Sequence, residues 1–430
     1  MLKGQFPVEK FASLRTPFYY YDLPLLRRTL DKIRECIEPY PQFHVHYAVK
    51  ANFNGRILQE ISRCGFGADC VSGGEIRAAL QNGFAPESIV YAGVGKSDEE
   101  ILLALDAGIA RFNVESAAEL EVINELALSR GVVAPVSLRV NPDIGAHTHA
   151  NITTGLAENQ FGINYEQLPG VIELADSLPG VEYKGLHFHI GSQILEMDDF
   201  VALCNRINVL AEQILRQRRG RLVPAASSAA AVGYSSSAVG SAAASVLGVA
   251  GSGVAAGVAG AAASVLGDIN VGGGLGINYY HPNHLDVAEF SQYFETFARH
   301  LKLPEGTPVH FELGRSVVAP CGSLISRVLY IKEGTTRRFA IIDASMTELI
   351  RPALYKAYHR VENISSYEPE EVYDVVGPVC ESSDVFAKGV SIDKCHRGDF
   401  IAIRSAGAYG ESMSSQYNCR PLPACFFKED

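Results

Sequence analysis

The chain has 430 residues, a formal net charge of -11 and nine cysteines. Its acidic and basic residues are interspersed, so there is no basic stripe for nucleic acid, and a small-molecule partner is favoured. No two cysteines form a CxxC pair, which argues against a zinc site and a disulfide framework and indicates a reducing compartment. The first residues, MLKGQFPVEKF, contain no apolar stretch long enough for a secretory signal, so we expect a cytoplasmic protein.

Outside one segment, the first three hundred or so residues alternate short apolar strands with amphipathic helices. Glycine closes helical runs such as GEIRAALQNG and SDEEILLALDAG. Eight strands are expected, at residues 43–51, 67–71, 88–93, 111–115, 136–141, 183–190, 269–273 and 308–314. Eight strands with helical crossovers favour a (β/α)8 barrel of the TIM type over an open doubly wound sheet.

After about residue 316 the pattern changes to strands and turns with little helix, as in SLISRVLYIKEG and GDFIAIRSAG. Such a run is typical of a separate antiparallel β domain. We therefore expect a barrel over residues 24–315 and a β domain assembled from residues 1–23 and 316–430.

One segment differs from the rest of the chain. Between Leu222 and Gly267 there is no charged residue, and AAASVLG occurs twice, at 242–248 and 261–267. A hydropathy scan suggests a membrane span, but alanine and glycine contribute little transfer energy and repeated glycines interrupt the run. An inserted surface loop, or a stretch not native to the chain, agrees better with the low complexity. Because residues 222–266 precede a barrel strand, we expect them to lie opposite the catalytic mouth.

Polar residues gather at one end of the expected strands. Active sites of (β/α)8 barrels lie at the carboxyl ends of the strands. The residues that fall at these ends are Lys50, Asp69, Glu115, Asn141, His189, Gly272 to Gly274 and Glu312 through Arg315. This placement predicts one site at the carboxyl end of the barrel.

Lys50 closes the apolar stretch of HVHYAVKAN, residues 44–52. Lysine is among the residues least often buried, because its ammonium group must then be desolvated or paired. One interpretation is a strand-end lysine that reaches solvent. The other is an amine with a lowered pKa, held at the mouth of the barrel for carbonyl chemistry.

A glycine-rich stretch, VGGGLG at residues 271–276, follows an expected strand. The dinucleotide fingerprint G-x-G-x-x-G fails because Ile277 stands where the last glycine is needed. Backbone amides of such a turn can still cradle one phosphate group, and Ser192 in HIGSQ can add a hydroxyl. Glycine as simple turn punctuation is the alternative.

Three histidine pairs, HFH at 187–189, HVH at 44–46 and HTH at 147–149, have a spacing that some barrel metallohydrolases use for a divalent ion. A metal site needs three or more ligands that converge at one barrel end. His44 and His46 lie early in their strand and HTH lies in an expected loop, so we expect no metal. For His187, a core histidine satisfied by hydrogen bonds is the alternative.

Three further motifs carry charged or reactive groups. ELGRS at 312–316 holds a carboxylate and a guanidinium three residues apart, either for a ligand or as a surface salt pair. GPVCESSD at 377–384 combines a thiol with a carboxylate, and AGAYG at 406–410 places a tyrosine between glycines, where the backbone can approach a ligand closely.

Seven motifs in this order cover nearly the whole chain: YAVKAN, HFHIGSQ, NVGGGLG, ELGRS, RPALY, GPVCES and AGAYG. Together they resemble the fold-type III pyridoxal-phosphate-dependent decarboxylases, which combine a barrel and a β domain in an alanine racemase-like fold, and most closely the diaminopimelate decarboxylase family. The resemblance implies conversion of meso-2,6-diaminopimelate to L-lysine and carbon dioxide, the last step of lysine biosynthesis, with pyridoxal 5'-phosphate as cofactor.

The resemblance also implies a cofactor site. Lys50 would hold pyridoxal phosphate as a Schiff base, His189 would stack on the pyridine ring, and Glu312 would face the ring nitrogen. The residues implied to bind the phosphate group are Ser192, Gly273, Gly274 and Tyr409, of which Tyr409 would also touch the substrate.

A second set of residues is implied in substrate binding. Arg315, Arg351 and Tyr355 would bind the distal carboxylate. Glu381 would take the distal amino group, and Cys380 would protonate the carbon that loses carbon dioxide. In this family the cysteine and the glutamate of the motif reach the site from the other subunit, which implies a homodimer with shared active sites.

Two features depart from the family pattern, and other functions stay open. Leu313 stands where the family commonly has proline, and residues 222–266 replace a short connection. The alternatives are another basic amino acid or carboxynorspermidine-type decarboxylase of the same fold, a metal-dependent barrel hydrolase, and a non-catalytic pyridoxal-phosphate carrier. No membrane or nucleic-acid partner is expected.

Overall fold

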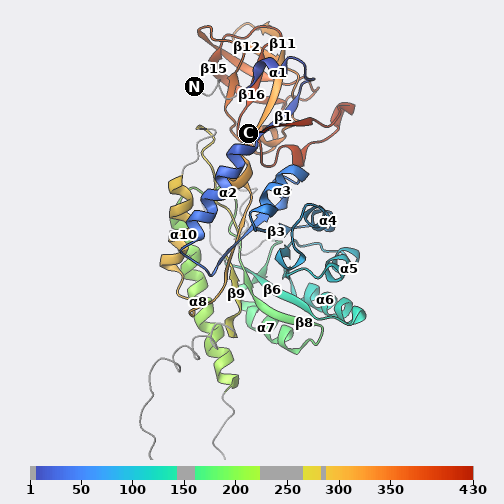
Figure 1. Ribbon diagram of the computed structural model, residues 1–430, viewed down its shortest axis with the longest axis vertical. Coiled ribbons are helices and arrows are strands. Elements are labelled where there is room, and N and C mark those ends of the chain that lie inside the picture. Colours follow the sequence, from blue (N-terminus) through green and yellow to red (C-terminus); the bar gives the residue numbers. More distant parts are fainter. Residues whose placement is uncertain (1–5, 143–159, 223–264, 282–286, 430) are drawn as a thin grey trace, which may run out of the picture.

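The computed structural model describes residues 6–142, 160–222, 265–281 and 287–429. A barrel and a β domain lie end to end along its longest axis (Figure 1). The HTH motif and residues 223–264 of the low-complexity segment lie outside the described ranges, so the expectations for them stay untested.

Eight parallel strands close into the barrel that the sequence predicts. Their order in the sheet is β5-β4-β3-β2-β10-β9-β8-β6, and pairing of β5 with β6 closes the ring. The strands are β2 (Phe43–Ala48), β3 (Gly67–Cys70), β4 (Ile89–Tyr91), β5 (Arg111–Val114), β6 (Ala134–Asn141), β8 (Val181–His187), β9 (Asp268–Asn270) and β10 (Val309–Leu313), with the short β7 (Ile163–Asn164) beside β6. Each of the eight begins and ends within three residues of its predicted bounds.

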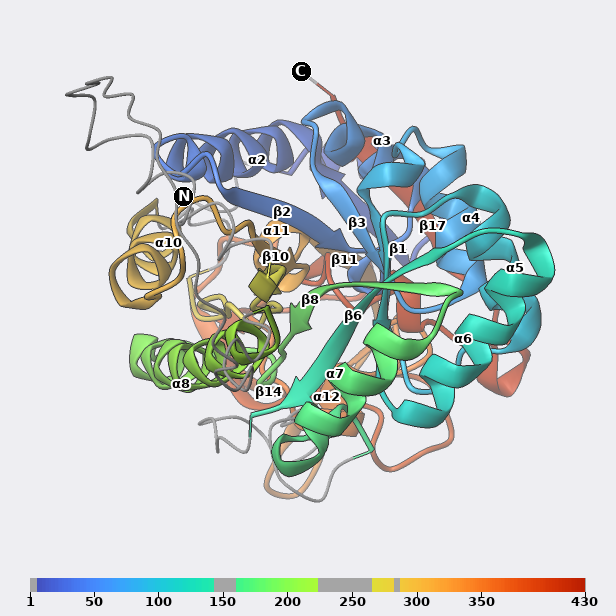
Figure 2. The same cartoon turned by 90° about the horizontal axis from the view of Figure 1, so that it is seen from below.

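A ring of helices covers the barrel (Figure 2). The helices that follow strands are α3 (Gly55–Arg63), α4 (Gly73–Gln81), α5 (Asp98–Ala107), α6 (Ala117–Arg130), α7 (Leu168–Ser177), α8 (Met197–Leu222) and α10 (Val287–His300). Only the short α11 (Arg315–Val318) follows β10, and α2 (Leu23–Ile37), which precedes β2, packs between α10 and α3 to complete the ring.

Local sequence explains where such a helix begins and ends. Ser97 caps α5 in a reciprocal capping box with Glu100, and Gly108 ends the helix in the left-handed conformation, with φ 67°. The glycine closure expected for this run is therefore confirmed.

The β domain contains a mostly antiparallel sheet. Its order is β13-β16-β11-β12-β14-β15, and β1 joins it by pairing with β11 and β17. The strands are β1 (Phe18–Asp22), β11 (Gly322–Glu333), β12 (Arg338–Ile342), β13 (Val361–Asn363), β14 (Glu370–Val376), β15 (Val385–Asp393), β16 (Phe400–Ile403) and β17 (Ala424–Lys428). Two pairs, β12 with β14 and β1 with β17, are parallel, so the expectation of an antiparallel domain holds for the other pairs only.

Further short helices occur in both domains. They are α1 (Val8–Phe11), α12 (Arg351–Tyr355) and the single-turn 3₁₀-helices η2 (Val49–Ala51), η3 (Pro86–Ser88), η4 (Tyr165–Gln167), η5 (Glu411–Met413) and η6 (Tyr417–Cys419). One hydrophobic cluster extends through the barrel into the β domain, and a smaller one around Phe11, Phe18 and Phe400 lies within the β domain. All nine cysteines are unpaired. No helix of the described ranges is both long and apolar enough to cross a membrane.

Gly185 in β8 tests the packing of neighbouring barrel strands. A Cβ atom at this position would lie 2.0 Å from the carbonyl oxygen of Asp268 in β9. We expect Gly185→Ala to lower the free energy of unfolding by about 2–3 kcal/mol, because the strands must move apart to admit the methyl group. Chemical denaturation measures this. The matched control is Gly170→Ala in α7, where nothing lies within 4 Å and stability should stay equal or rise; similar effects of both variants would contradict the packing argument.

Candidate active site

The carboxyl ends of the barrel strands bring the predicted residues together. Lys50 lies in η2, directly after β2, and Asp69 lies in β3, the neighbouring strand. The Lys50 Nζ atom is 3.9 Å from Oδ2 of Asp69. Asp69 is 1% exposed, and its Oδ1 has no hydrogen-bond partner among the described residues. Lys50 is surrounded by protein, yet 42% of its side chain is exposed to solvent at the mouth of the barrel.

The charge state of Lys50 differs from the prediction. Burial by itself would lower the pKa of the Lys50 amine, but the negative charge of Asp69 is the largest opposing influence, and the pKa is raised. The sequence interpretation expected a lowered pKa and is wrong on this point. It treated the lysine alone, whereas the opposing carboxylate comes from the next strand.

Glu312, in β10, is the centre of a buried polar network. Its Oε1 accepts hydrogen bonds from the side-chain amides of Asn270 at 2.7 Å and Asn113 at 3.3 Å. Its Oε2 lies 3.1 Å from Nε2 of His187. These partners belong to β9, β5 and β8, so four barrel strands converge on one carboxylate.

His187 has a defined place in this network. A carboxylate only accepts hydrogen bonds, so Nε2 of His187 donates, and its Nδ1 has no partner in the described part of the chain. Burial by itself would raise the pKa of Glu312, but His187, as a charge and as a hydrogen-bond partner, lowers it well below its usual range. Glu312 therefore stays ionised at neutral pH. The core-histidine alternative for His187 is right as to burial and hydrogen bonding, but the partner is a residue of the site.

His189 and the glycine-rich turn lie beside this network. Nδ1 of His189 accepts a hydrogen bond of 3.3 Å from the backbone N–H of Gly273. Burial and the charge of Lys50 lower the pKa of His189 well below its usual value, so its ring is neutral. A Cβ atom at Gly273 would lie 1.9 Å from the carbonyl oxygen of Glu312, and Gly274 has φ 110°. Only glycine allows the turn to lie this close to β10.

A cavity of about 310 Å³ lies against the turns that follow β8, β10 and β16. It is lined by Ser192, Gln193, Arg315, Arg351, Tyr355, Ala357, Tyr409 and Met413. Five of these residues were predicted for the site: Ser192, Arg315, Arg351, Tyr355 and Tyr409. The backbone N–H of Tyr409, a residue with φ 56°, donates to the carbonyl of Ala51 at 2.8 Å, which ties the β domain to the residue after Lys50.

Two guanidinium groups lie at this cavity without a carboxylate partner among the described residues. Arg315 and Arg351 are 7% and 5% exposed. Nη1 of Arg315 donates to the hydroxyl of Tyr279 at 2.7 Å, and Nη1 of Arg351 donates to the same oxygen at 2.8 Å. Nη2 of Arg315 also donates to Oγ of Ser192 at 2.9 Å. Two buried positive charges with neutral partners make a site for an anion, and a planar fork suits a carboxylate.

Cys380 and Glu381 stand apart from this cavity. Both are exposed and lie in the turn between β14 and β15. Neither lines the cavity formed by the other predicted residues. A single chain thus does not bring the predicted thiol and the second predicted carboxylate to the arginine pair.

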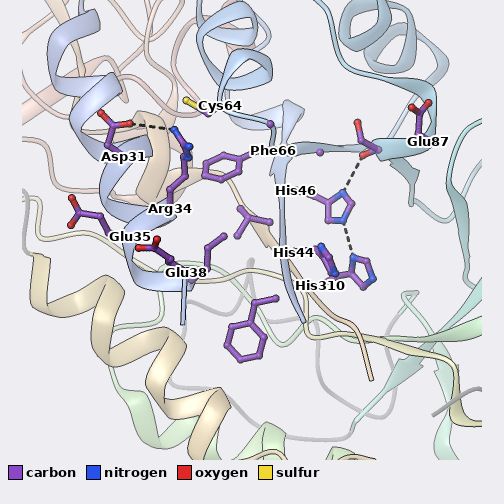
Figure 3. Close-up of a pocket in the computed structure, with 16 residues that line it drawn as sticks. Asp31, Arg34, Glu35, Glu38, His44, His46, Cys64, Phe66, Glu87 and His310 are labelled. Carbon is purple, nitrogen blue, oxygen red and sulfur yellow. Dashed lines mark hydrogen bonds and ion pairs between the residues drawn. The ribbon is translucent and has the colours of Figure 1, made fainter. Parts of the chain in front are cut away.

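The opposite end of the barrel holds a separate cavity of about 760 Å³ (Figure 3). There Nε2 of His46 lies 2.9 Å from Nδ1 of His310, and Nε2 of His310 lies 3.3 Å from Asp268. The ring of His44 stacks on His310 at 5.1 Å. No group of three or more His, Cys, Asp or Glu side chains in the described ranges could hold a metal ion. His44 and His46 lie early in β2 and His310 early in β10, so this histidine group is at the end of the barrel opposite His189.

Sequence reasoning missed several residues of the site: Asn113, Arg139, Asn270, Tyr279 and His359. The asparagines carry a usable signal, since both are polar residues inside apolar strands. Arg139, which pairs with Glu115 at 2.7 Å, was hidden in a strand read only for its pattern. Tyr279 and His359 lie in loops and carry no pattern at all.

Comparisons with known proteins agree with this geometry. The family model described as "Pyridoxal-dependent decarboxylase, pyridoxal binding domain" matches residues 26–218. The diaminopimelate decarboxylase of Bacteroides thetaiotaomicron is 53% identical over 429 residues, 100% of both chains, and that of Zymomonas mobilis is 37% identical over 96% of this chain and 87% of its own length. The crystal structure of diaminopimelate decarboxylase from Helicobacter pylori complexed with L-lysine has a TM-score of 0.80 and 34% identity, and covers 98% of this chain and 94% of that chain.

The barrel, the β domain and these matches define a pyridoxal-phosphate-dependent decarboxylase. The fold and the cofactor expected from the sequence are thereby confirmed. At this identity over its full length, the chain belongs to the diaminopimelate decarboxylase family.

The groups at the strand ends fit this cofactor. Lys50 would offer an amine for its aldehyde, and Glu312 would offer an ionised carboxylate for its ring nitrogen. The turn of Gly272 to Gly274 runs so close to β10 and to Gly191 that added Cβ atoms would clash with the backbone, so the turn requires glycine.

Asn270 tests the network around Glu312. Its amide donates to Glu312, and its Oδ1 accepts from the N–H of Gly272 at 2.8 Å. We expect Asn270→Asp to lower the free energy of unfolding at neutral pH by roughly 3–5 kcal/mol, because it removes a donor and sets a like charge against a buried carboxylate. The deficit relative to the unchanged protein should shrink as the pH falls, because protonation of either carboxyl group ends the repulsion. Urea denaturation at several pH values measures it. Asn270→Ala removes the donor without the charge and should cost less; an equal loss would argue against the charge effect.

Proposed function

We propose that this protein decarboxylates meso-2,6-diaminopimelate to L-lysine and carbon dioxide. The observation that carries the proposal is the pair of buried guanidinium groups, Arg315 and Arg351, at a cavity whose lining residue Tyr409 is hydrogen-bonded to Ala51, the residue after Lys50. A substrate with a carboxylate at its far end neutralises both charges. The Helicobacter pylori relative was solved with L-lysine, which retains that carboxylate. The nine unpaired cysteines support a cytoplasmic location.

Several residues would hold the cofactor in this proposal. Bound pyridoxal phosphate supplies an electron sink for the electron pair released when carbon dioxide leaves. Lys50 would hold it through its amine, and the neutral ring of His189 is suited to stack on an aromatic ring. The residues proposed to bind its phosphate group are Ser192, Gly273, Gly274 and Tyr409.

Glu312 would keep a proton at the pyridine nitrogen. A carboxylate held ionised by His187 and two asparagine amides accepts a hydrogen bond from that N–H and stabilises the positive ring. Because its partners are already in place, little reorganisation is needed when the cofactor binds.

Arg315, Arg351 and Tyr355 would bind the distal carboxylate of the substrate and so orient the molecule. The bond between the α-carbon and its carboxylate then breaks, and the carbon that keeps the electrons must take up one proton. Cys380 is the proposed donor of that proton, and Glu381 would bind the distal ammonium. Both are exposed in one chain and away from its cavity, which supports a homodimer in which each subunit completes the site of the other.

The alternative functions, another decarboxylase of this fold and a non-catalytic carrier, agree less well with the residues that line the cavity. A decarboxylase of lysine-like substrates without a distal carboxylate would leave Arg315 and Arg351 buried without a counter-charge. A carrier without catalysis would need neither the arginine pair nor the exposed thiol of Cys380.

Release of carbon dioxide from meso-diaminopimelate by the purified holoenzyme tests the proposed reaction. We expect Lys50→Ala to abolish the visible absorbance of the bound cofactor and to lower turnover by orders of magnitude, because a covalent attachment is lost. Lys302→Ala, at an exposed position, is the control and should leave both unchanged. No carbon dioxide from the unchanged protein would refute the function, and near-normal turnover of Lys50→Ala would refute the role of Lys50.

Mixing two inactive variants tests the shared site. If a site combines Lys50 of one subunit with Cys380 of the other, a mixed dimer of Lys50→Ala and Cys380→Ala has one intact site and one that lacks both groups. Random exchange should then restore about a quarter of the activity. If each subunit builds its own site, every site carries one defect, and mixing should restore nothing. Size-exclusion chromatography with light scattering confirms the dimers before the assay.

A further inference from the structure

Tyr279 holds the two cavity arginines in a fixed relation. It lies in the loop after β9 and is 8% exposed. Its hydroxyl oxygen accepts from Arg315 at 2.7 Å and from Arg351 at 2.8 Å. One oxygen therefore joins a guanidinium from the start of α11, at the barrel mouth, to one from the start of α12, in the β domain.

His359 fixes Arg351 from the β domain. It is 1% exposed, and its Nδ1 donates to the carbonyl oxygen of Arg404, the residue after β16, at 2.9 Å. Because Nδ1 carries the ring proton, Nε2 is an acceptor, and it receives a hydrogen bond from Nη1 of Arg351 at 2.9 Å. Burial and the charge of Arg351 lower the pKa of His359 to about 3, so the ring stays neutral at physiological pH. The same ring packs edge-on against Tyr279, with centroids 5.1 Å apart.

The residues that hold the two arginines are both uncharged hydrogen-bond acceptors. The two lone pairs of the Tyr279 oxygen are taken by the arginines, and the one lone pair of neutral His359 is taken by Arg351. Both partners are uncharged. Aspartate or glutamate in their place would hold the arginines as firmly but would cancel the positive charge that an incoming carboxylate needs. A neutral clamp orders the pair and leaves both charges available.

We infer that Tyr279 and His359 are positioning residues for recognition of the distal carboxylate. They set the separation and orientation of Arg315 and Arg351, and so select ligands that carry a carboxylate at the far end over amines of the same length that lack it. The inference rests on the proposed function and names what determines specificity in it.

Two ligands that differ in one group provide the test. L-lysine, the proposed product, keeps the distal carboxylate, and 1,5-diaminopentane lacks it. Titration calorimetry of the holoenzyme with each ligand needs no turnover. Tyr279→Phe keeps the ring that packs on His359 and removes the shared oxygen. We expect its affinity for L-lysine to fall about ten-fold or more, with the affinity for diaminopentane unchanged. The variant loses the hydrogen bonds that position Arg315 and Arg351, and only L-lysine has a carboxylate that binds these arginines.

Variants of His359 separate positioning from packing. His359→Phe removes the acceptor for Arg351 and should weaken L-lysine binding as Tyr279→Phe does. His359→Gln offers an amide oxygen instead and should retain most of the affinity. Tyr280→Phe, at the neighbouring residue that is 62% exposed, is the matched control and should change neither affinity. Melting temperature and visible cofactor absorbance show that each variant is folded and loaded.

Two outcomes would overturn the inference. One is unchanged affinity of Tyr279→Phe for L-lysine; the other is an equal loss for both ligands, which is the mark of a general structural role. A third outcome points elsewhere: if the unchanged holoenzyme binds L-lysine no more tightly than diaminopentane, the arginine pair is not the carboxylate site, and the proposed substrate fails together with the clamp.

Discussion

The burial of one carboxylate governs the inside of this barrel. An ionised group removed from water must find donors for its oxygens, or it costs several kcal/mol. Glu312 finds them in Asn113, Asn270 and His187, which come from three other strands. Those strands cannot slide relative to β10 without leaving a donor or an oxygen unpaired. The closure of the barrel and the ionisation of Glu312 therefore support each other.

The site that results separates opposite charges. Glu312 is held ionised at the strand ends inside the barrel, whereas Arg315 and Arg351 place two positive charges at the cavity. In the proposed reaction, a substrate with a carboxylate at its far end would be held by attraction at that end while its reacting end meets Lys50. Binding energy gained at the remote end would then contribute to orientation at the reacting carbon, where it lowers the barrier.

The sequence predicts much of this arrangement, but the contacts across the interior depend on how the barrel closes. Alternation of strands and helices predicts the barrel, and the position of Lys50 or Glu312 at a strand end predicts the face on which the site lies. Which residues meet across the interior depends on strand order and stagger, which are not local properties. The sequence around Asn113 therefore does not predict its contact with Glu312, 199 positions away. The raised pKa of Lys50 likewise depends on Asp69, which only the strand order places beside it.

In the inferred recognition of the distal carboxylate, the β domain contributes to substrate specificity although its residues lie far along the sequence from the barrel strands. Arg351, His359 and the carbonyl of Arg404 come from this domain, and Tyr279 links them to Arg315 at the barrel mouth. The backbone of Tyr409 makes a second link, to Ala51 beside the lysine. The network around Glu312 lies wholly within the barrel. In the proposed function, the groups that would meet the far end of the substrate come from both domains and so depend on how the domains dock. A change in a β-domain loop can thus alter which substrate is held while the network around Glu312 stays intact.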